Sequence, residues 1–201
     1  ESAAGDVFNI NYHGGIHSHM DGVAHFGWRG KLYNGFYFEL SKDGFANVGV
    51  EHIAQQGIFG RGVLVDLLNL YQINHLPPGT MIEAEHLKAW ERHTDTTIGS
   101  GDILLPRVGR WQIAKDDPDY DALEATVGIH ASIGPWLKAR DVAAIGRDAI
   151  SDAMPGGVES VFNPVHTLAN AALGMPIFDH PQLDQAAQIA ANLNRQTFLF
   201  S

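Results

Sequence analysis

The 201-residue sequence predicts a layered α/β domain. Short apolar runs of the buried-strand kind alternate with segments of helical spacing, and glycine or proline separates most of them. No internal repeat, low-complexity tract or long linker interrupts this alternation. We therefore expect a single domain over residues 1–201, which is long enough to bury a hydrophobic core.

The first half of the chain is expected to form three strands and two helices. In chain order, a strand, a helix, a strand, a helix and a strand are predicted at residues 6–13, 47–60, 61–70, 80–94 and 101–109. Gly57 closes the first helix, and the second carries Leu87 and Trp90 on one face, with acidic residues early as the helix dipole prefers. Pro106 weakens the last strand because proline has no amide hydrogen to donate.

The second half is expected to alternate in the same way. We predict a helix followed by a strand within residues 130–146, helices at 163–174 and 182–194, and a final strand at 195–201. The helix at 163–174 has Asn163 as its N-cap, Pro164 at its first position and Gly174 at its end. The final "RQTFLFS" has the composition of a strand interior and stops abruptly, so we expect a fragment of a longer chain.

Composition and charge argue against several classes of function. The formal net charge of -10 disfavours binding to nucleic acid or to an anionic membrane surface, because both need a basic face. No apolar run approaches the roughly 20 residues that span a bilayer, so we expect no membrane association and, by default, a cytoplasmic protein. Cysteine is absent, which leaves His, Asp and Glu as metal ligands. A small-molecule substrate is the expected partner.

Residues 13–26, HGGIHSHMDGVAHF, hold four histidines and an aspartate. In an extended segment, side chains two apart face the same side, so His17, His19 and Asp21 would point one way. Two imidazoles and a carboxylate with positions left open suit a catalytic divalent transition metal. His25 lies four residues beyond Asp21, past a glycine where the chain can bend, and is placed to act as a proton shuttle.

The same stretch resembles the signature of a known family. The motif of that family is H-x-G-T-H-x-D-x-P-x-H, and His19, Asp21 and His25 fall on its second histidine, its aspartate and its last histidine. The segments "WRGKLYNG", "GDILLPRVGRW", "GIHASIGPWLKARDVAAIGRDAISD" and "VHTLANAALGMPIFDH" resemble further parts of the pattern. The sequence thus resembles the cyclase family of metal-dependent hydrolases, which includes bacterial kynurenine formamidases and isatin hydrolase. The resemblance implies the swivelling β/β/α fold, a homo-oligomer (dimer or tetramer), and one or two divalent ions, zinc or manganese, per subunit.

The resemblance also implies site residues in the second half of the chain. In two-metal relatives, a histidine on a late helix and an acidic residue about a dozen positions later complete the second metal, and His166 and Asp179 resemble them. We further place Trp28, His130 and His13 in the substrate pocket, with Trp28 as a wall for a planar aromatic group.

Three positions depart from the family's pattern. Gly15 takes the place of the first motif histidine, Ala24 that of the motif proline, and Val108 that of the threonine in R-T-G. His17 or His13 then supplies the missing ligand, and of the two His17 has the strand phase. These departures leave the metal count and the substrate open.

The resulting hypothesis is metal-assisted hydrolysis of an amide C–N bond in a small carbonyl substrate, such as an N-formyl aryl amide or a cyclic amide. A divalent ion lowers the pKa of water and polarises the carbonyl, while His25 carries the proton. The alternative is an inactive relative that uses the metal to grip a ligand. A cupin-type double sheet fits less well, because that fold has almost no helices and helices are abundant here. A TIM-barrel amidohydrolase also fits less well, because that barrel typically needs roughly 250 residues. No chemistry is assigned to His52, His75, His86, His93 and His180.

Overall fold

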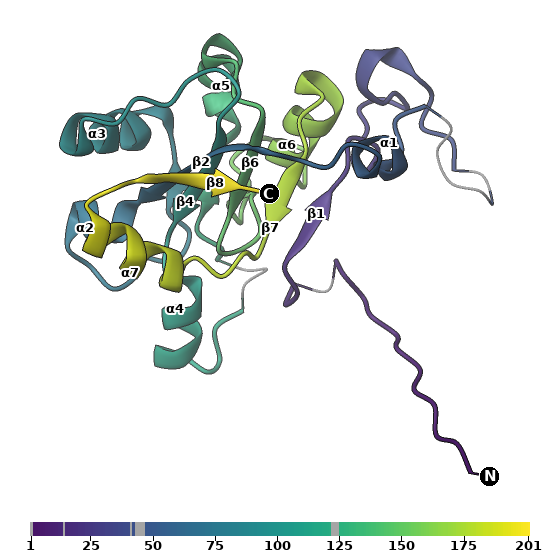
Figure 1. Ribbon diagram of the computed structural model, residues 1–201. Helices are drawn as coiled ribbons and strands as arrows, with labels where there is room; N and C mark the ends of the chain where they lie inside the picture. The colour runs from purple at the N-terminus through teal and green to yellow at the C-terminus, as the bar shows by residue number, and fades with distance from the viewer. Residues whose placement is uncertain (1, 14, 41, 43–46, 122–124) are drawn as a thin grey trace.

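A computed structural model describes residues 2–13, 15–40, 42, 47–121 and 125–201 of the chain. Its centre is a six-stranded sheet in the order β1-β7-β6-β4-β2-β8 (Figure 1). The four inner strands run parallel, and β1 and β8 pair antiparallel at the two edges. These strands are β1 His19–Asp21, β2 Gly60–Asp66, β4 Ile103–Arg107, β6 Ala144–Arg147, β7 Ile177–Asp179 and β8 Thr197–Phe200. A second, two-stranded parallel sheet consists of β3 Met81–Ile82 and β5 Gly128–Ile129.

Helices connect most of these strands. The α-helices are α1 Val50–Ala54, α2 Leu67–Tyr71, α3 Ala84–Thr94, α4 Arg110–Asp116, α5 Gly134–Arg140, α6 Pro164–His166 and α7 Asp184–Leu193. Two short 3₁₀ turns, η1 Tyr33–Gly35 and η2 Ala131–Ile133, also occur, and a π-helical segment, η3 Thr167–Leu173, continues α6. Within the described ranges, none of the helices is long and apolar enough to cross a membrane.

Strand alternation explains the layers. In β2, Val63 and Val65 pack into the larger core with Trp90 of α3, whereas Leu64 points to the opposite face and packs into a smaller core with Ala187 of α7. Both faces of the inner strands are apolar, as expected of parallel strands covered by helices on either side. The predicted layered α/β fold is confirmed.

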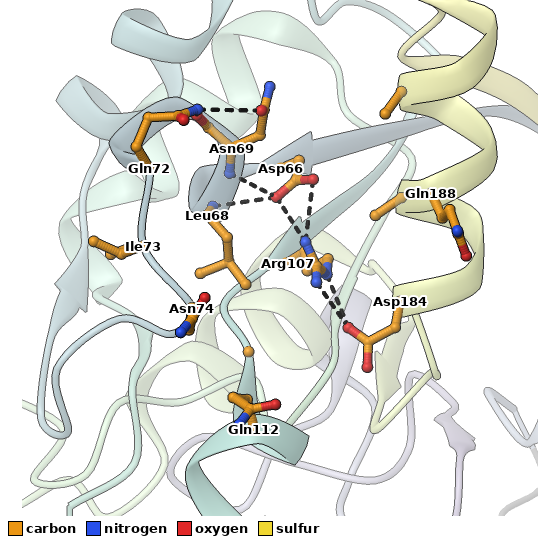
Figure 2. A pocket seen from close by; sticks show the side chains of 13 residues that line it. Asp66, Leu68, Asn69, Gln72, Ile73, Asn74, Arg107, Gln112, Asp184 and Gln188 are labelled. Atoms are coloured by element: carbon orange, nitrogen blue, oxygen red, sulfur yellow. Dashed lines mark hydrogen bonds and ion pairs between the residues drawn. The ribbon is translucent and has the colours of Figure 1, made fainter. Parts of the chain in front are cut away.

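Some predicted boundaries differ from the structure. The apolar run 61–70 splits into β2 and α2, because the Asp66 carboxylate accepts from two backbone amides of the next turn and starts a helix (Figure 2). Pro106 lies inside β4, whose pairing with β6 stops at Leu104. Toward β6, the missing amide hydrogen of Pro106 therefore removes no hydrogen bond between the strands.

The predicted strand at residues 6–13 is wrong. Every residue of this segment is exposed, and none of them joins a sheet in the described part of the chain. The segment has the composition of a strand but no strand edge to pair with. Regular strand geometry starts only at His19, since residues 15–17 bend. The alternation that was to place His17 on the face of Asp21 therefore does not extend back to it.

Candidate metal centre

Three elements converge on a cavity of about 640 Å³ at the β1 edge of the sheet. We call it the histidine cavity, because it is lined by His13, His19, His25, His166 and His180. β1 pairs antiparallel with β7, and this register sets His19 directly opposite Asp179. α6 begins after Asn163 and ends at His166, whose Nε2 faces carboxylates from both strands. Residues far apart in sequence are thereby brought together around Asp21, at the end of β1.

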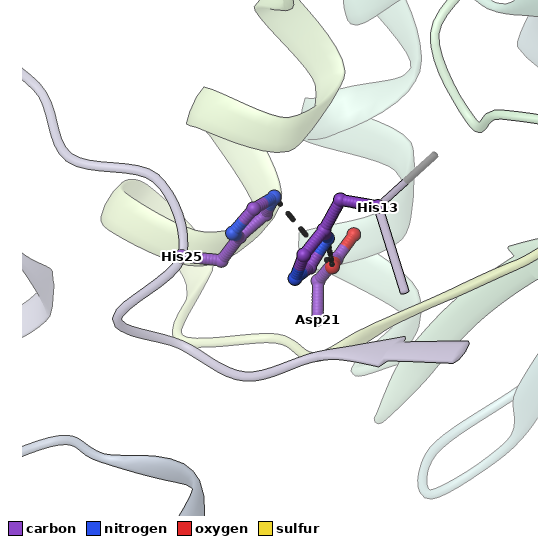
Figure 3. A group of neighbouring side chains, drawn as sticks. All are labelled: His13, Asp21 and His25. Atoms are coloured by element: carbon purple, nitrogen blue, oxygen red, sulfur yellow. Dashed lines mark ion pairs between the residues drawn. The ribbon is translucent and has the colours of Figure 1, made fainter. Parts of the chain in front are cut away.

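Asp21 lies at the centre of this group. Its side chain is 1% exposed, and its Oδ1 lies 3.1 Å from Nδ1 of His13 (Figure 3). The Nε2 atoms of His19 and His25 lie 3.5 and 3.6 Å from the same oxygen. Oδ1 nevertheless accepts no hydrogen bond from any residue in the described ranges. A buried carboxylate oxygen without a partner is costly, so this arrangement calls for a cation among the rings.

His19 is oriented for metal binding. Its Nδ1 lies 2.8 Å from the carbonyl oxygen of His17 and donates its hydrogen there, which leaves the lone pair of Nε2 on the side of Asp21. His19, Asp21 and Asp179 each offer one ligand atom, and these atoms lie within 4.8 Å of one another. They form the first of two groups that could hold a metal ion.

His166 meets three carboxylates. Its Nδ1 hydrogen-bonds Asp152, and its Nε2 lies 3.1 Å from Oδ2 of Asp21 and 3.3 Å from Oδ2 of Asp179. Burial alone would lower the pKa of His166, but its hydrogen bonds to these carboxylates raise that pKa well above the usual value. Burial would raise the pKa of Asp179, and the contact with His166 lowers it instead. Nε2 thus faces two anionic oxygens, a position that a proton or a bound cation satisfies.

Asp152 and Ser151 hold these side chains in place. Asp152 accepts from the amides of Val165, at 2.6 Å, and His166, at 3.1 Å, so it caps the start of α6 and also fixes the His166 ring. Ser151 donates from its amide and its hydroxyl to Oδ1 of Asp179, at 3.0 and 2.6 Å, which leaves Oδ2 facing His166. Sequence reasoning missed both residues, because their role depends on how the chain returns between β6 and α6.

His25 and His13 stack together beside Asp21, with ring centroids 4.3 Å apart and planes 13° from parallel. A turn brings His25 there, since its amide donates to the carbonyl of Gly22. With Asp21, the two rings form the second group that could hold a metal ion. Burial lowers the pKa of His25, and the charge of Asp21 offsets only part of that shift, so the ring is largely neutral near pH 7. A neutral imidazole can bind a metal or accept a proton.

His180 and Arg110 line the same cavity. Nη1 of Arg110 lies 3.0 Å from Nδ1 of His180, and Nη2 donates to the carbonyl of Gly15 at 2.8 Å. Burial and the charge of Arg110 lower the pKa of His180 to about 4, so this ring is neutral and its Nδ1 accepts. The sequence analysis gave His180 no chemistry. Strand alternation would turn it away from Asp179, but its φ of 61° interrupts the strand geometry.

Three residues predicted for the site lie elsewhere. His17 is exposed and belongs to neither group of possible ligands, whereas His13, the alternative, lies against Asp21. Trp28 is 47% exposed and lines a separate apolar pocket of about 470 Å³. His130 caps η2 with its side chain and does not line the histidine cavity.

The donor set fits a divalent ion. Imidazole nitrogens and carboxylate oxygens converge in both groups, and Asp21 is common to the two. Mixed nitrogen and oxygen sites without thiolate suit zinc, manganese or iron. Such an ion would explain why Oδ1 of Asp21 accepts no hydrogen bond from the described part of the chain.

The fold matches solved structures of cyclases and hydrolases. A crystal structure described as a novel cyclase matches with a TM-score of 0.74 at 24% identity, covering 89% of this chain and 60% of that chain. Isatin hydrolase A from Ralstonia solanacearum matches with a TM-score of 0.60 at 21% identity, covering 84% of this chain and 60% of that chain. A potential metal-dependent hydrolase with cyclase activity matches with 0.51 at 16% identity, covering 88% and 66%. This chain thus spans about 60% of the length of the first two structures.

The sequence also matches the model of a protein family over most of its length. No curated protein matches the chain. The family described as Putative cyclase matches residues 4–152, about three quarters of the sequence. This range includes β1 with Asp21 and extends to Asp152, whereas His166 and Asp179 lie beyond it. The matched range and the shared fold agree, and the chain belongs to the cyclase family.

Proposed function

We propose that this chain is a metal-dependent hydrolase that cleaves an amide C–N bond of a small carbonyl substrate. The observation that carries the proposal is Asp21, a buried carboxylate among three imidazoles with one oxygen that no described residue hydrogen-bonds. The cyclase family and the likeness of the fold to isatin hydrolase A support the same class of reaction. At these identities the solved structures support the fold, so the activity is the proposal.

The residues that would hold a metal follow from the two groups. His19, Asp21 and Asp179 would hold one ion, with His166 at its edge, and His13 belongs to the group that would hold a second. A bound divalent ion supplies Lewis acidity, which polarises a substrate carbonyl and lowers the pKa of water. Zinc and manganese are the ions we propose, one or two per chain.

We assign His25 to proton transfer. Its ring lies at the cavity, 30% exposed, and is neutral near pH 7 because burial lowers its pKa. It would accept a proton from the attacking water and return it to the departing amine nitrogen. The stacked His13 holds the ring in position against Asp21.

The rest of the cavity supports a substrate that is partly apolar. Ile16, Phe26, Ile150 and Phe162 line it beside the polar cluster. N-formyl aryl amides and cyclic amides such as isatin have an amide carbonyl attached to a planar apolar body, which fits this lining. They are therefore the substrate classes we propose.

Gly15 favours the alternative of an inactive relative, since it replaces the first motif histidine. The nitrogen of His13, 3.1 Å from Oδ1 of Asp21, provides an imidazole at the cluster in spite of that replacement. We therefore propose a catalytically active protein.

The test is hydrolysis of N-formylkynurenine and isatin by the purified protein before chelation, after chelation, and after zinc or manganese is added back. We expect turnover of at least one substrate, loss of turnover with chelator, and recovery with one of the two ions. Stoichiometric metal without turnover of any formyl aryl amide or cyclic amide would contradict the proposed reaction. Turnover that persists after the metal has been removed would contradict the role of the metal.

A further inference from the structure

Arg110 is a cation on the wall of the histidine cavity. Its guanidinium is half-buried and, among the described residues, makes two hydrogen bonds, one to Nδ1 of His180 and one to the carbonyl of Gly15. A guanidinium carries five N–H donors, so three remain for another partner. Neither partner of Arg110 carries a negative charge, because one is a neutral ring and the other a backbone carbonyl.

Other partly buried arginines of the protein are paired with carboxylates. Arg107, which lines a different pocket, lies between Asp66 and Asp184, with contacts of 3.1 and 3.0 Å (Figure 2). The partly buried Arg140 pairs in the same way with Glu91 at 2.7 Å, and even the exposed Arg61 pairs with Asp102. Within the described ranges, no carboxylate lies within ion-pair distance of Arg110.

A half-buried cation that no described carboxylate contacts directly is costly unless a ligand supplies the anion. Burial lowers the pKa of Arg110, and the charges of Tyr120 and Asp148, which lie beyond contact distance, offset only part of that shift. Arg147 also lacks an ion pair within the described residues, but it is fully buried and lines no described cavity. Among these cations Arg110 is the one that a ligand in the histidine cavity can reach.

The cavity connects Arg110 to the candidate metal cluster. His180 contacts Arg110 on one side, and its ring centroid lies 5.8 Å from that of His19 on the other. Ile16 and Ile150 provide apolar lining of the same cavity. A ligand could therefore place a carbonyl at the cluster, an apolar body along the lining and an anionic group at Arg110.

We propose that Arg110 determines specificity by binding a carboxylate of the substrate, on the side of the cavity away from the bond that is cleaved. The planar fork of arginine matches the two oxygens of a carboxylate and makes charge-assisted hydrogen bonds. This inference rests on the proposed function for the identity of the cleaved bond. The binding of the anion itself does not depend on turnover.

The competing role for Arg110 is to brace the loop at Gly15 through the carbonyl contact. A bracing residue would affect charged and neutral ligands equally. A carboxylate-binding residue would affect the charged ligand alone. The experiment therefore measures a ratio of affinities for two ligands of the same shape.

The ligands are meta- and para-ureidobenzoate and the matching ureidobenzamides, whose urea carbonyl is a poor electrophile and resists hydrolysis. Binding to the protein as purified, with its metal, is measured by calorimetry for the wild type and for Arg110→Gln, Arg110→Lys and Arg92→Gln. Arg92 is exposed on α3 and controls for the loss of one positive charge. Circular dichroism checks that each variant is folded.

We expect the wild type and Arg92→Gln to bind at least one ureidobenzoate roughly 10- to 100-fold more tightly than its carboxamide, the range of a charge-assisted contact. Arg110→Gln should bring this ratio close to one by weakening the carboxylate alone. Arg110→Lys should retain part of the preference, because it keeps the charge but loses the fork.

Equal affinities for carboxylate and carboxamide in the wild type, or no binding of either carboxylate, would overturn the inference. A preference that survives in Arg110→Gln would do the same. If the preference is present and depends on Arg110 while no amide is hydrolysed, the anion site stands and the proposed function fails. If amides are hydrolysed without any carboxylate preference, the function stands and this inference fails.

Discussion

Asp21 concentrates the chemistry of the site in one side chain. It ends β1, is 1% exposed, and has an oxygen that no described residue hydrogen-bonds although imidazoles surround it. Burying a carboxylate in this way is unfavourable unless a cation is present. The proposal of a metal site therefore depends on the missing hydrogen bond at Oδ1 of Asp21, among the described residues, as well as on the family.

His25 has two possible roles that one variant separates. If it carries protons, His25→Ala should keep its metal and lose roughly 100- to 10,000-fold in turnover, the usual contribution of acid-base catalysis. Metal content by elemental mass spectrometry and turnover by absorbance check the two parts. His93→Ala, on the exposed side of α3, serves as the matched control and should change neither quantity. Loss of metal from His25→Ala would make His25 a ligand instead.

The pKa of His180 predicts a pH dependence of stability. In the folded protein it lies at about 4, below the ordinary value of 6.5, because burial and Arg110 disfavour the charged ring. As the pH falls, the unfolded chain takes up this proton first. The contribution of the neutral His180 ring to the free energy of unfolding is therefore complete above pH 6.5 and is lost between pH 6.5 and pH 4. His180 is itself buried but borders the cavity, where solvent screens part of this cost, so we expect a loss of roughly 1–2 kcal/mol.

The comparison is between the wild type and His180→Gln, both metal-free, by urea unfolding at several pH values. Gln can still accept from Arg110 but does not titrate. The raised pKa of His166 has the opposite effect, because the stabilisation from the charged ring is lost as the pH rises. This loss occurs at higher pH, so it does not obscure the change expected between pH 6.5 and pH 4. Identical pH profiles for the two proteins would contradict the assignment.

At the residue level, the sequence predicts some of the cluster and misses the rest. His19 and Asp21 follow from alternation along a strand, which holds because β1 starts at His19. His17 fails as a member of the cluster because the bend before β1 breaks the alternation, and His13 occupies the position beside Asp21. Arg110 carries no local signal in the sequence, because only the packing of α4 against the cavity gives it a role.

At the level of elements, the short helix α6 positions His166, and Asp152 holds both. α6 is the first turn of a helical segment that continues as η3, and the Asp152 carboxylate accepts from two amides of this first turn. The Asn163-Pro164 start is readable in the sequence. The cap from Asp152 is not, because it comes from a preceding segment that the fold brings back.

Asp152→Asn tests this arrangement. It should lower the free energy of unfolding by about 1 kcal/mol through the weakened cap. It should also weaken metal binding about 10- to 100-fold, because the ring of His166 loses its acceptor. Asp66→Asn weakens the similar cap of α2 at a different pocket and is the control. We expect Asp66→Asn to lose stability and keep its metal affinity; equal metal affinity in the two variants would contradict the role of Asp152.

At the level of the whole molecule, alternation of apolar strands and amphipathic helices was enough to predict the α/β class. The sequence could not predict that β1 lies antiparallel at one edge beside β7, since pairing between residues so far apart leaves no local pattern. Composition alone suggested a strand at residues 6–13, where the structure has exposed coil. Strand propensity describes a residue that fits a sheet, and a sheet partner is still required.

Metal binding should also stabilise the whole fold. The group of His19, Asp21 and Asp179 joins β1 with β7, so the ion binds the folded chain far better than the unfolded one. At a metal concentration 100-fold above Kd, the stabilisation is about 2.7 kcal/mol. Differential scanning calorimetry should therefore show Tm falling by roughly 5–10 °C on chelation and recovering with zinc or manganese. Asp21→Asn should show no such shift, and an equal shift in that variant would place the metal elsewhere.

The most direct test of the central claim is the amount of metal per chain in the wild type and in Asp21→Asn. Both proteins are loaded with zinc or manganese, dialysed, and measured by elemental mass spectrometry against protein concentration. We predict one or two ions per chain in the wild type and almost none in Asp21→Asn, because Asp21 is common to both groups of ligands. Metal retained equally by both proteins, or absent from the wild type, would contradict the account.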